Sequence, residues 1–273
     1  MDKNAPIGVF DSGVGGLTVA REIMRQLPEE RIVYFGDTAR LPYGSKSKST
    51  IIRFSDQIIR FLRTKDVKAI VIACNTASSY ALDAVRKHED IPIIGVINAG
   101  ARAAVAATRN GKIGVIGTEG TINSGTYAEV ISSMKPGVKV YGKACPLLVP
   151  LAEEGLFHDT VTDMIASRYL SVLKEKYVDT LVLGCTHYPL LRSALGRVMG
   201  SDVTLVNPAY ETAVQLKTLL KSMEMDCDEG RNLSLDEKYE FYVSDMADKF
   251  CAFATAILPE EVKKTVQIDI ESY

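Results

Sequence analysis

The sequence has no tryptophan, only three histidines and only five cysteines among 273 residues. The cysteines are odd in number and form no CxxC pair, which argues against a disulfide framework and against a zinc site. Because the histidines are few and unclustered, we expect no metal ion. Positive charge is not in excess either, since 32 Lys and Arg stand against 34 Asp and Glu. A chain of formal net charge −2 has no basic field for nucleic acid or a membrane surface, so we expect neither as a partner.

Long apolar runs are also missing. Charged residues interrupt every strand-like segment well before the roughly 18 to 20 residues that a membrane helix requires. The segment Met1–Pro6 has no basic stretch followed by an apolar one, as a secretory signal would have. We therefore expect a cytoplasmic protein whose cysteines are reduced thiols.

The sequence does contain a regular alternation of short apolar runs and segments of helical periodicity. Leu17, Ala20 and Ile23, for example, recur at helical spacing. Strands that are apolar on both faces are typical of parallel sheets covered by helices on both sides. We predict an α/β fold of two pseudo-symmetric, doubly wound lobes with parallel-type sheets, and an active site in the cleft between them. The predicted strands are Ile7–Phe10, Arg31–Phe35, Ala69–Ala73, Ile91–Ile97, Lys112–Ile116, Val138–Tyr141, Thr180–Leu183, Val203–Val206 and Glu240–Val243.

Three short sequences occur twice, in the same order and at nearly constant spacing. Chance resemblance between buried strands could explain any one pair, but three ordered pairs favour a duplicated α/β unit. The pairs are Ile7–Ser12 with Ile113–Thr118, Val67–Cys74 with Val178–Cys185, and Asn98–Val105 with Asn207–Val214.

The repeat also suggests where the chain divides. We predict that residues 1–97 and 208–273 form the first lobe and that residues 98–207 form the second, with Pro208 compatible with a hinge. The polar tail beyond Pro259 has little to bury, and we expect it to be a loose appendage.

Cys74 and Cys185 each end one of the duplicated apolar runs. This puts each sulfur at the carboxyl end of a strand and the amino end of a helix, where open α/β sheets bind ligands and helix amides favour a thiolate. A thiol has an ordinary pKa of about 8.5, so each sulfur can serve as base in one form and as acid in the other. A single buried cysteine is more often an inert small hydrophobe. Two matched thiols in two matched lobes favour chemistry from two sides.

Three ionisable residues stand out beside the thiols. His187 lies two residues beyond Cys185, where an imidazole would stabilise the thiolate or carry its proton. Glu153 follows an apolar run and is either a site acid or a carboxylate in the first turn of a helix. Asp11 near a thiolate would raise the thiol pKa by like-charge repulsion, so its role must be to hold an ammonium group or relay a proton.

Two loops follow predicted strands. Residues 11–16 contain three glycines in four positions, which would leave amides free for a carboxylate or phosphate, although a tight turn explains them too. This is no dinucleotide signature, because Thr18 stands where the last glycine is needed. We expect the next helix to be capped by Ser45, within residues 37–45, or by Ser47 or Ser49 just beyond them. Capping does not explain Tyr43 and Gly44, which leaves them for another role.

Four motifs together resemble the glutamate racemases, the cofactor-independent enzymes of the aspartate/glutamate racemase superfamily. The resemblance covers nearly the whole chain and departs from the family at none of the shared positions. It implies interconversion of L- and D-glutamate without pyridoxal phosphate or metal, a supply of D-glutamate for bacterial peptidoglycan, and often a homodimer. The motifs are Phe-Asp-Ser-Gly-Val-Gly-Gly-Leu, Tyr-Phe-Gly-Asp-Thr-Ala-Arg-Leu-Pro-Tyr-Gly, Ala-Cys-Asn-Thr-Ala-Ser and Leu-Gly-Cys-Thr-His-Tyr-Pro.

The resemblance also implies residue roles. Cys185 would take the α-proton from L-glutamate and Cys74 would take it from D-glutamate, with Asp11 assisting Cys74. Glu153 and His187 would assist Cys185. The implied substrate-binding residues are Asp11, Ser12, Tyr43, Gly44, Asn75, Thr76, Thr118, Thr121, Thr186 and His187.

Two thiols are needed for a physical reason. A single base that returns the proton to the face it came from restores the starting enantiomer, so inversion requires an acid on the opposite face.

Two alternatives stay open: a racemase of another acidic amino acid such as aspartate, and a non-catalytic two-lobe protein that binds a small dicarboxylate.

Overall fold

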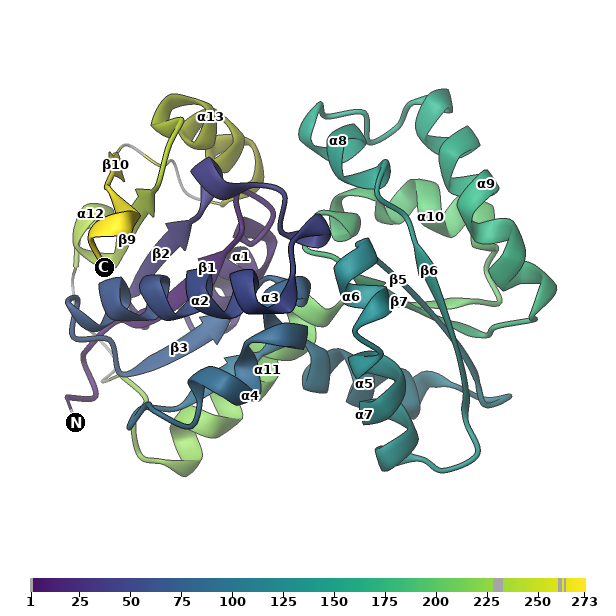
Figure 1. The fold of residues 1–273 in the computed structure, drawn as a ribbon, viewed down its shortest axis with the longest axis horizontal. Helices are drawn as coiled ribbons and strands as arrows, with labels where there is room; N and C mark the ends of the chain where they lie inside the picture. Colours follow the sequence, from purple (N-terminus) through teal and green to yellow (C-terminus); the bar gives the residue numbers. More distant parts are fainter. Residues whose placement is uncertain (1, 228–232, 260–261, 263) are drawn as a thin grey trace.

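The structure, a computed structural model, describes residues 2–227, 233–259, 262 and 264–273. Two separate sheets, of six and four strands, form two lobes that lie side by side (Figure 1). Every strand pairing in both sheets is parallel. The prediction of an α/β protein with two doubly wound lobes is confirmed.

The first lobe contains the six-stranded sheet, in the order β10-β9-β2-β1-β3-β4. Its strands β1 to β4 are buried throughout, which explains why their sequences are apolar on both faces. Helices α1, α11 and α13 cover one face, and α2, α3 and α4 cover the other. The strands are β1 (Ile7–Asp11), β2 (Ile32–Gly36), β3 (Ala69–Ile72), β4 (Ile93–Gly95), β9 (Tyr239–Val243) and β10 (Thr265–Gln267). The helices are α1 (Leu17–Gln26), α2 (Lys48–Arg63), α3 (Asn75–Tyr80), α4 (Leu82–Val85), α11 (Pro208–Ser222), α12 (Leu235–Lys238) and α13 (Ala247–Ile257).

The second lobe contains the four-stranded sheet, in the order β6-β5-β7-β8. This repeats the order β2-β1-β3-β4 of the first lobe, as a duplicated unit would. Helices α5 and α7 cover one face, and α8, α9 and α10 cover the other. The strands are β5 (Lys112–Gly117), β6 (Lys139–Ala144), β7 (Thr180–Gly184) and β8 (Thr204–Val206). The helices are α5 (Val96–Ala107), α6 (Glu119–Asn123), α7 (Thr126–Met134), α8 (Leu148–Glu153), α9 (Thr160–Glu175) and α10 (Arg192–Met199).

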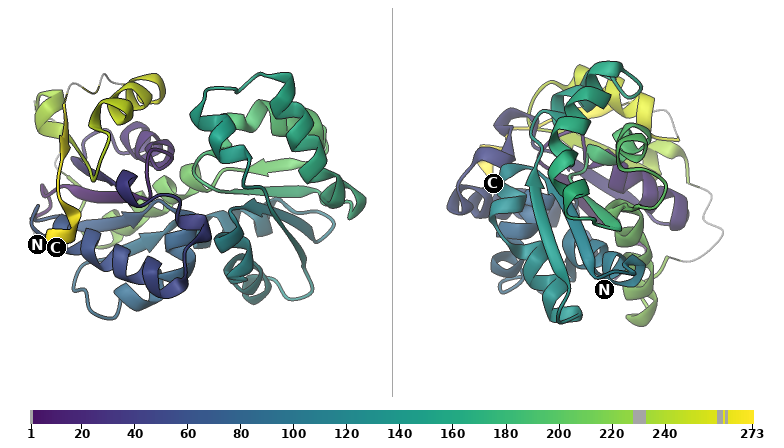
Figure 2. Two further views of the ribbon diagram at one scale, coloured as in Figure 1. Left: turned by 45° about the horizontal axis from the view of Figure 1, so that its top comes forward. Right: turned by 90° about the vertical axis from the view of Figure 1, so that its right-hand side faces the viewer.

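Two helices connect the lobes. Helix α5 begins directly after β4, and α11 begins at Pro208, capped by the Asn207 side chain, which accepts a hydrogen bond from the amide of Ala209 at 3.1 Å. The two helices pack against each other where the lobes meet (Figures 1 and 2). The predicted lobe boundaries fall at these helices, one inside α5 and one just before α11, and they stay a prediction.

The strand predicted over Ile91–Ile97 is shorter than expected. Strand β4 covers only Ile93–Gly95, and helix α5 already begins at Val96. The apolar residues at its carboxyl end belong to a buried helix face, which an apolar run cannot distinguish from a buried strand.

The expectation of a loose tail beyond Pro259 is wrong. Strand β10 pairs with β9 at the edge of the first sheet. A short 3₁₀ helix, η4 (Ile270–Ser272), follows it, with Ile270 only 3% exposed. The ring of Tyr273 packs edge-on against Phe61, with 5.4 Å between centroids. The few apolar residues of this segment cover a part of the first sheet that is built from residues far away in the sequence.

Over the part of the chain that is described, no helix is both long enough and apolar enough to span a bilayer.

Candidate active site

The two cysteines occupy equivalent positions in the two lobes. Cys74 follows β3 and is the N-cap residue of α3, while Cys185 follows β7 and precedes a 3₁₀ helix, η3 (Tyr188–Leu191). Each is 6% exposed, and both line a single cavity of about 340 Å³ between the lobes. The sulfurs therefore reach one site from opposite lobes.

Most of the residues predicted for the site line this cavity, and two do not. Asp11 and Thr121 are buried behind the cavity wall, at 0% and 1% exposure. Thr121 lies in hydrogen-bonding distance of the hydroxyls of Thr76, at 3.3 Å, and Thr118, at 3.1 Å. The predicted residues that line the cavity are Ser12, Tyr43, Gly44, Cys74, Asn75, Thr76, Thr118, Glu153, Cys185, Thr186 and His187.

Sequence reasoning missed part of the cavity wall. These residues are mostly apolar, so they carry no chemical signal of their own. Their only signal is proximity in sequence to Tyr43, Thr118 or Glu153. They are Leu41, Pro42, Ser45, Glu119, Pro146, Val149 and Pro150.

The surroundings of Cys74 favour its neutral thiol form. Burial, and after it the charge of the nearby Asp11 carboxylate, raise the pKa of Cys74 to about 12. The amide of Ala77 in α3 and the hydroxyl of Ser12, 3.7 Å from the sulfur, oppose this. The expectation that helix amides would favour a thiolate is wrong at Cys74, because desolvation outweighs them.

Asp11 uses one oxygen to close its own loop. Its Oδ2 accepts hydrogen bonds from the amides of Gly13 and Gly16, each at 3.0 Å. The expectation that these amides are free for a ligand is therefore wrong. The other oxygen, Oδ1, is buried and has no hydrogen-bond partner in the described part of the chain. Burial raises the pKa of Asp11, although its bonds to the glycine amides and the charge of His187 counteract this.

Cys185 lies beside a cation. His187 Nδ1 is 3.8 Å from the Cys185 sulfur, and His187 Nε2 is 3.0 Å from Glu153 Oε1. Burial alone would lower the pKa of His187, but hydrogen bonds with Cys185 and Glu153 outweigh it and raise the pKa to about 10. The bond to His187 in turn lowers the pKa of Glu153. Glu153 is the last residue of α8, so its alternative interpretation as a first-turn carboxylate is wrong.

The residues that follow each cysteine are bonded to the opposite lobe. The Tyr127 hydroxyl donates to Asn75 Oδ1 at 2.8 Å, and the hydroxyls of Thr76 and Thr118 are also 2.8 Å apart. The Thr18 hydroxyl of α1 donates to the carbonyl of Thr186 at 2.9 Å. These contacts connect each thiol-bearing loop to the opposite lobe.

The side chains present limit what the site can hold. No group of three or more His, Cys, Asp or Glu side chains suited to a metal ion occurs within the described ranges. The described residues that line the cavity include no lysine, so none of them could form a Schiff base with an aldehyde cofactor. His88 and His158 are exposed. The arrangement is suited to acid–base chemistry from two sides of a small, polar substrate.

Comparison with known proteins agrees with this geometry. The family model described as Asp/Glu/Hydantoin racemase matches residues 7–216. A glutamate racemase of Geobacter metallireducens is 48% identical over 266 residues, which is 97% of each chain.

Solved structures agree as well. The crystal structure of a glutamate racemase isoform from Bacillus anthracis matches with a TM-score of 0.92 and 41% identity, over 98% of both chains. A glutamate racemase from Francisella tularensis, solved in complex with D-glutamate, matches with a TM-score of 0.91 and 39% identity. That match covers 99% of this chain and 100% of the other.

Proposed function

This chain belongs to the Asp/Glu/hydantoin racemase family and is a glutamate racemase, and we propose that its two catalytic bases are Cys74 and Cys185. The observation that carries this assignment is that both thiols line one cavity from opposite lobes. One thiol removes the α-proton from one face of the substrate carbon, and the other delivers a proton to the opposite face. No other pair of opposed thiols lines that cavity among the residues described.

The chemistry in the L-to-D direction follows from the two environments. Cys185, beside the imidazolium of His187, acts as a thiolate and forms an S–H bond with the α-proton of L-glutamate as the C–H bond breaks. The electron pair stays on the α-carbon, and Cys74 gives its S–H proton to the other face. The products are D-glutamate, a Cys185 thiol and a Cys74 thiolate, and the reverse reaction restores the starting form.

Asp11, Glu153 and His187 assist the bases. Glu153 holds the His187 ring through its bond to Nε2, and His187 stabilises negative charge on Cys185. Asp11 favours the protonated form of Cys74 by like-charge repulsion. We propose that Asp11, buried behind the cavity wall, offsets the charge of the substrate ammonium from there or relays a proton.

The substrate carboxylates are bound by neutral donors. No Lys or Arg occurs among the described lining residues, whereas hydroxyls and amides of Ser12, Asn75, Thr76, Thr118 and Thr186 surround the space. Thr121 supports the hydroxyls of Thr76 and Thr118 from behind, and Tyr43 and Gly44 form the wall beside Thr118. A cavity of about 340 Å³ is large enough for one amino acid and small enough to exclude most water around it. Preorganised neutral dipoles stabilise the carbanion without holding the substrate too tightly.

We further propose that the enzyme is a homodimer in the cytoplasm and supplies D-glutamate for peptidoglycan. We also propose that residues 1–97 with 208–273 and residues 98–207 close on each other about α5 and α11 during turnover. Light scattering on the purified protein checks the dimer, since a single species near the monomer mass of 29.8 kDa would exclude it.

The decisive experiment compares Cys74→Ala and Cys185→Ala with the parent enzyme. Each variant should lose about 10²- to 10⁴-fold in racemisation of either enantiomer, measured by chiral chromatography, because each lacks one of two required acid–base groups. In deuterated water the parent should place deuterium at the α-carbon of the product. Undiminished racemisation in either single variant would refute the assignment, and absence of α-deuterium in the parent would favour a non-catalytic binding protein. A panel with aspartate separates the remaining alternative substrate.

A further inference from the structure

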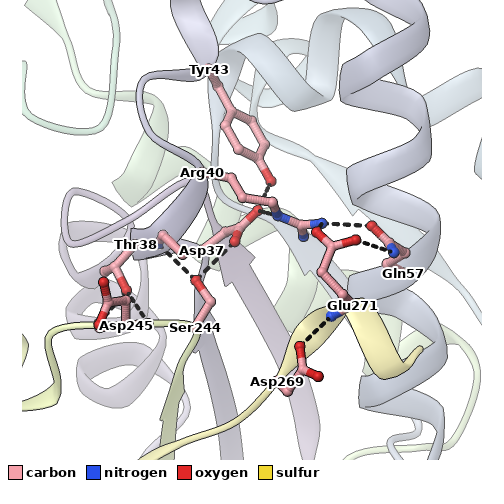
Figure 3. A network of polar contacts seen from close by, with 10 residues as sticks. Asp37, Thr38, Arg40, Tyr43, Gln57, Ser244, Asp245, Asp269 and Glu271 are labelled. Atoms are coloured by element: carbon pink, nitrogen blue, oxygen red, sulfur yellow. Dashed lines mark hydrogen bonds and ion pairs between the residues drawn. The ribbon is translucent and has the colours of Figure 1, made fainter.

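A second, polar cluster lies behind Tyr43, one of the residues that line the cavity. This cluster, which we call the Arg40 network, comprises Asp37, Arg40, Gln57, Ser244 and Glu271 (Figure 3). Its members come from the loop after β2, from α2, from the loop after β9 and from η4. None of them lines the substrate cavity.

Asp37 is the buried centre of the network. Its side chain is 0% exposed, and both of its oxygens are satisfied. Oδ1 accepts from the Ser244 hydroxyl at 2.9 Å, and Oδ2 accepts from Arg40 Nε at 2.7 Å and from the Tyr43 hydroxyl. A buried carboxylate requires such partners, so the direction of the Tyr43 side chain is fixed by Asp37.

Arg40 connects this buried centre to the carboxyl-terminal segment. Its Nη1 donates to Gln57 Oε1 at 2.6 Å and to Glu271 Oε1 at 3.1 Å, while its guanidinium lies over the ring of Phe54, 4.0 Å from the centroid. Gln57 Nε2 donates to the other oxygen of Glu271 at 3.3 Å. Because a guanidinium is planar and its donors are fixed relative to one another, holding one edge on Glu271 orients the edge on Asp37.

Tyr43 connects the Arg40 network to the substrate cavity. It begins the short 3₁₀ helix η2 (Tyr43–Ser45), whose residues line the substrate site. On the cavity side, the next residue, Gly44, packs so closely on the opposite lobe that an added Cβ would lie 2.7 Å from Thr118 Cβ. The turn is therefore held between the other lobe in front and the Arg40 network behind.

We propose that Glu271 is a positioning residue for substrate binding, acting through Arg40 and Asp37 on the Tyr43–Ser45 turn. The inference rests on the proposed function, because it requires that this turn contacts the substrate. The side chain of Glu271 is 59% exposed, so a role in folding alone would be small. Its effect is instead on the placement of a wall that the substrate contacts both before and during the reaction.

The test is Glu271→Gln, which keeps the size of the side chain and removes its charge. A partly exposed ion pair of this kind changes an equilibrium by up to about fivefold, so we expect KM for D-glutamate to rise about three- to fivefold. The turnover number kcat should change less than about twofold, because uniform binding is lost. The thermal midpoint should shift by no more than a few degrees, about 2 to 4 °C.

A matched control and a double variant make the test specific. Asp163→Asn removes another exposed ion pair, the one with Arg197 at 2.8 Å in the second lobe, and should leave KM unchanged. Tyr43→Phe removes the hydroxyl that meets Asp37 and should raise KM about tenfold. If Glu271 acts through Tyr43, adding Glu271→Gln to Tyr43→Phe should raise KM no further.

The outcomes are distinguishable. An unchanged KM in Glu271→Gln, or a rise that is fully additive with Tyr43→Phe, overturns the positioning role. A lower thermal midpoint with kcat and KM both unchanged also overturns it, since the contact would then serve stability alone. Failure of the two-base assignment shows separately, as racemisation that survives Cys74→Ala or Cys185→Ala.

Discussion

Gly15 is the position where the smallest chemical change should have the largest effect on the site. It lies in the loop before α1 of the first lobe, directly against the Cys185 side of the cavity. A Cβ added there would lie 2.4 Å from Thr186 Oγ1 and 2.5 Å from His187 Cε1. Ordinary Cβ contacts begin at 3.4 Å, so Gly15→Ala must push these groups apart by about 1 Å.

That displacement should lower the activity more than the stability, because it moves His187, which assists the base Cys185. His187 cannot move by about 1 Å and keep both its 3.8 Å contact with Cys185 and its 3.0 Å bond to Glu153. Misplacement of this size in a preorganised site costs about 10²-fold in rate, which corresponds to about 2.7 kcal/mol of activation free energy. Overpacking should lower the free energy of unfolding by about 1 to 3 kcal/mol, which a protein of this size survives.

The assay is racemisation of each enantiomer, followed by chiral chromatography. The enantiomers have equal free energies in water, so kcat/KM must fall by the same factor in both directions. An unequal fall would reveal an error in the assay. Gly196→Ala is the matched control, because its added methyl group lies 3.7 Å from Leu205 Cδ1 inside α10. The control should keep full activity and gain up to about 1 kcal/mol of stability. A folded Gly15→Ala enzyme within twofold of the parent kcat/KM would refute the reasoning.

Three further predictions follow from the contacts. The pKa of His187 is raised from 6.5 to about 10, so its stabilising effect is complete below pH 6.5 and is lost as the pH rises towards 10. The difference in unfolding free energy between the parent and His187→Asn should therefore shrink over that range in urea titrations, and a constant difference would contradict the raised pKa. Lys68 is 0% exposed, and its Nζ lies 2.6 Å from Glu30 Oε2 and donates to the carbonyl of Met225 at 2.7 Å. Lys68→Met leaves the Glu30 carboxylate buried without its cation and should destabilise by about 3 to 5 kcal/mol in the same titrations, whereas a loss below 1 kcal/mol would show that water reaches the pair. Dialysis against EDTA should leave racemisation unchanged, and loss of activity that added metal restores would overturn the expectation that no metal takes part.

The parts of the fold that sequence predicted well are those fixed by local pattern. Strands such as β1 and β7 are buried on both faces, so their apolar runs are continuous and end close to the predicted residue. Loops at the carboxyl ends of such strands converge in any parallel sheet, which is why Cys74 could be assigned to a site from the residues alone. Asn75 and Thr76 are assigned through the family resemblance. Ser47 caps α2 by accepting from the amide of Thr50 at 3.3 Å, as local sequence indicated for one of three serines.

The errors concern quantities that depend on the folded surroundings. The tail near Ile270 is polar in sequence, and only the assembled sheet provides the surface that it covers. The amides of Gly13 and Gly16 are occupied because Asp11 folds back on its own loop. Burial raises the pKa of Cys74 by more than the α3 amides lower it, and the sequence does not show how deeply a residue is buried. Each error arises from a balance between a local preference and a tertiary contact.

The two thiols have different electrostatic surroundings, and this difference gives the substrate a part in the acid–base chemistry. The strand order is the same around both thiols, yet Cys74 has the carboxylate of Asp11 nearby and Cys185 has the imidazolium of His187. Burial and the charge of Asp11 raise the pKa of Cys74 to about 12, so ionisation of Cys74 during the reaction with D-glutamate needs a compensating charge. Reaction of D-glutamate requires a cation or a proton that offsets the charge of Asp11 while Cys74 is ionised. The substrate ammonium provides such a cation, and it would act on Asp11 through the cavity wall, because Asp11 is 0% exposed and does not line the cavity.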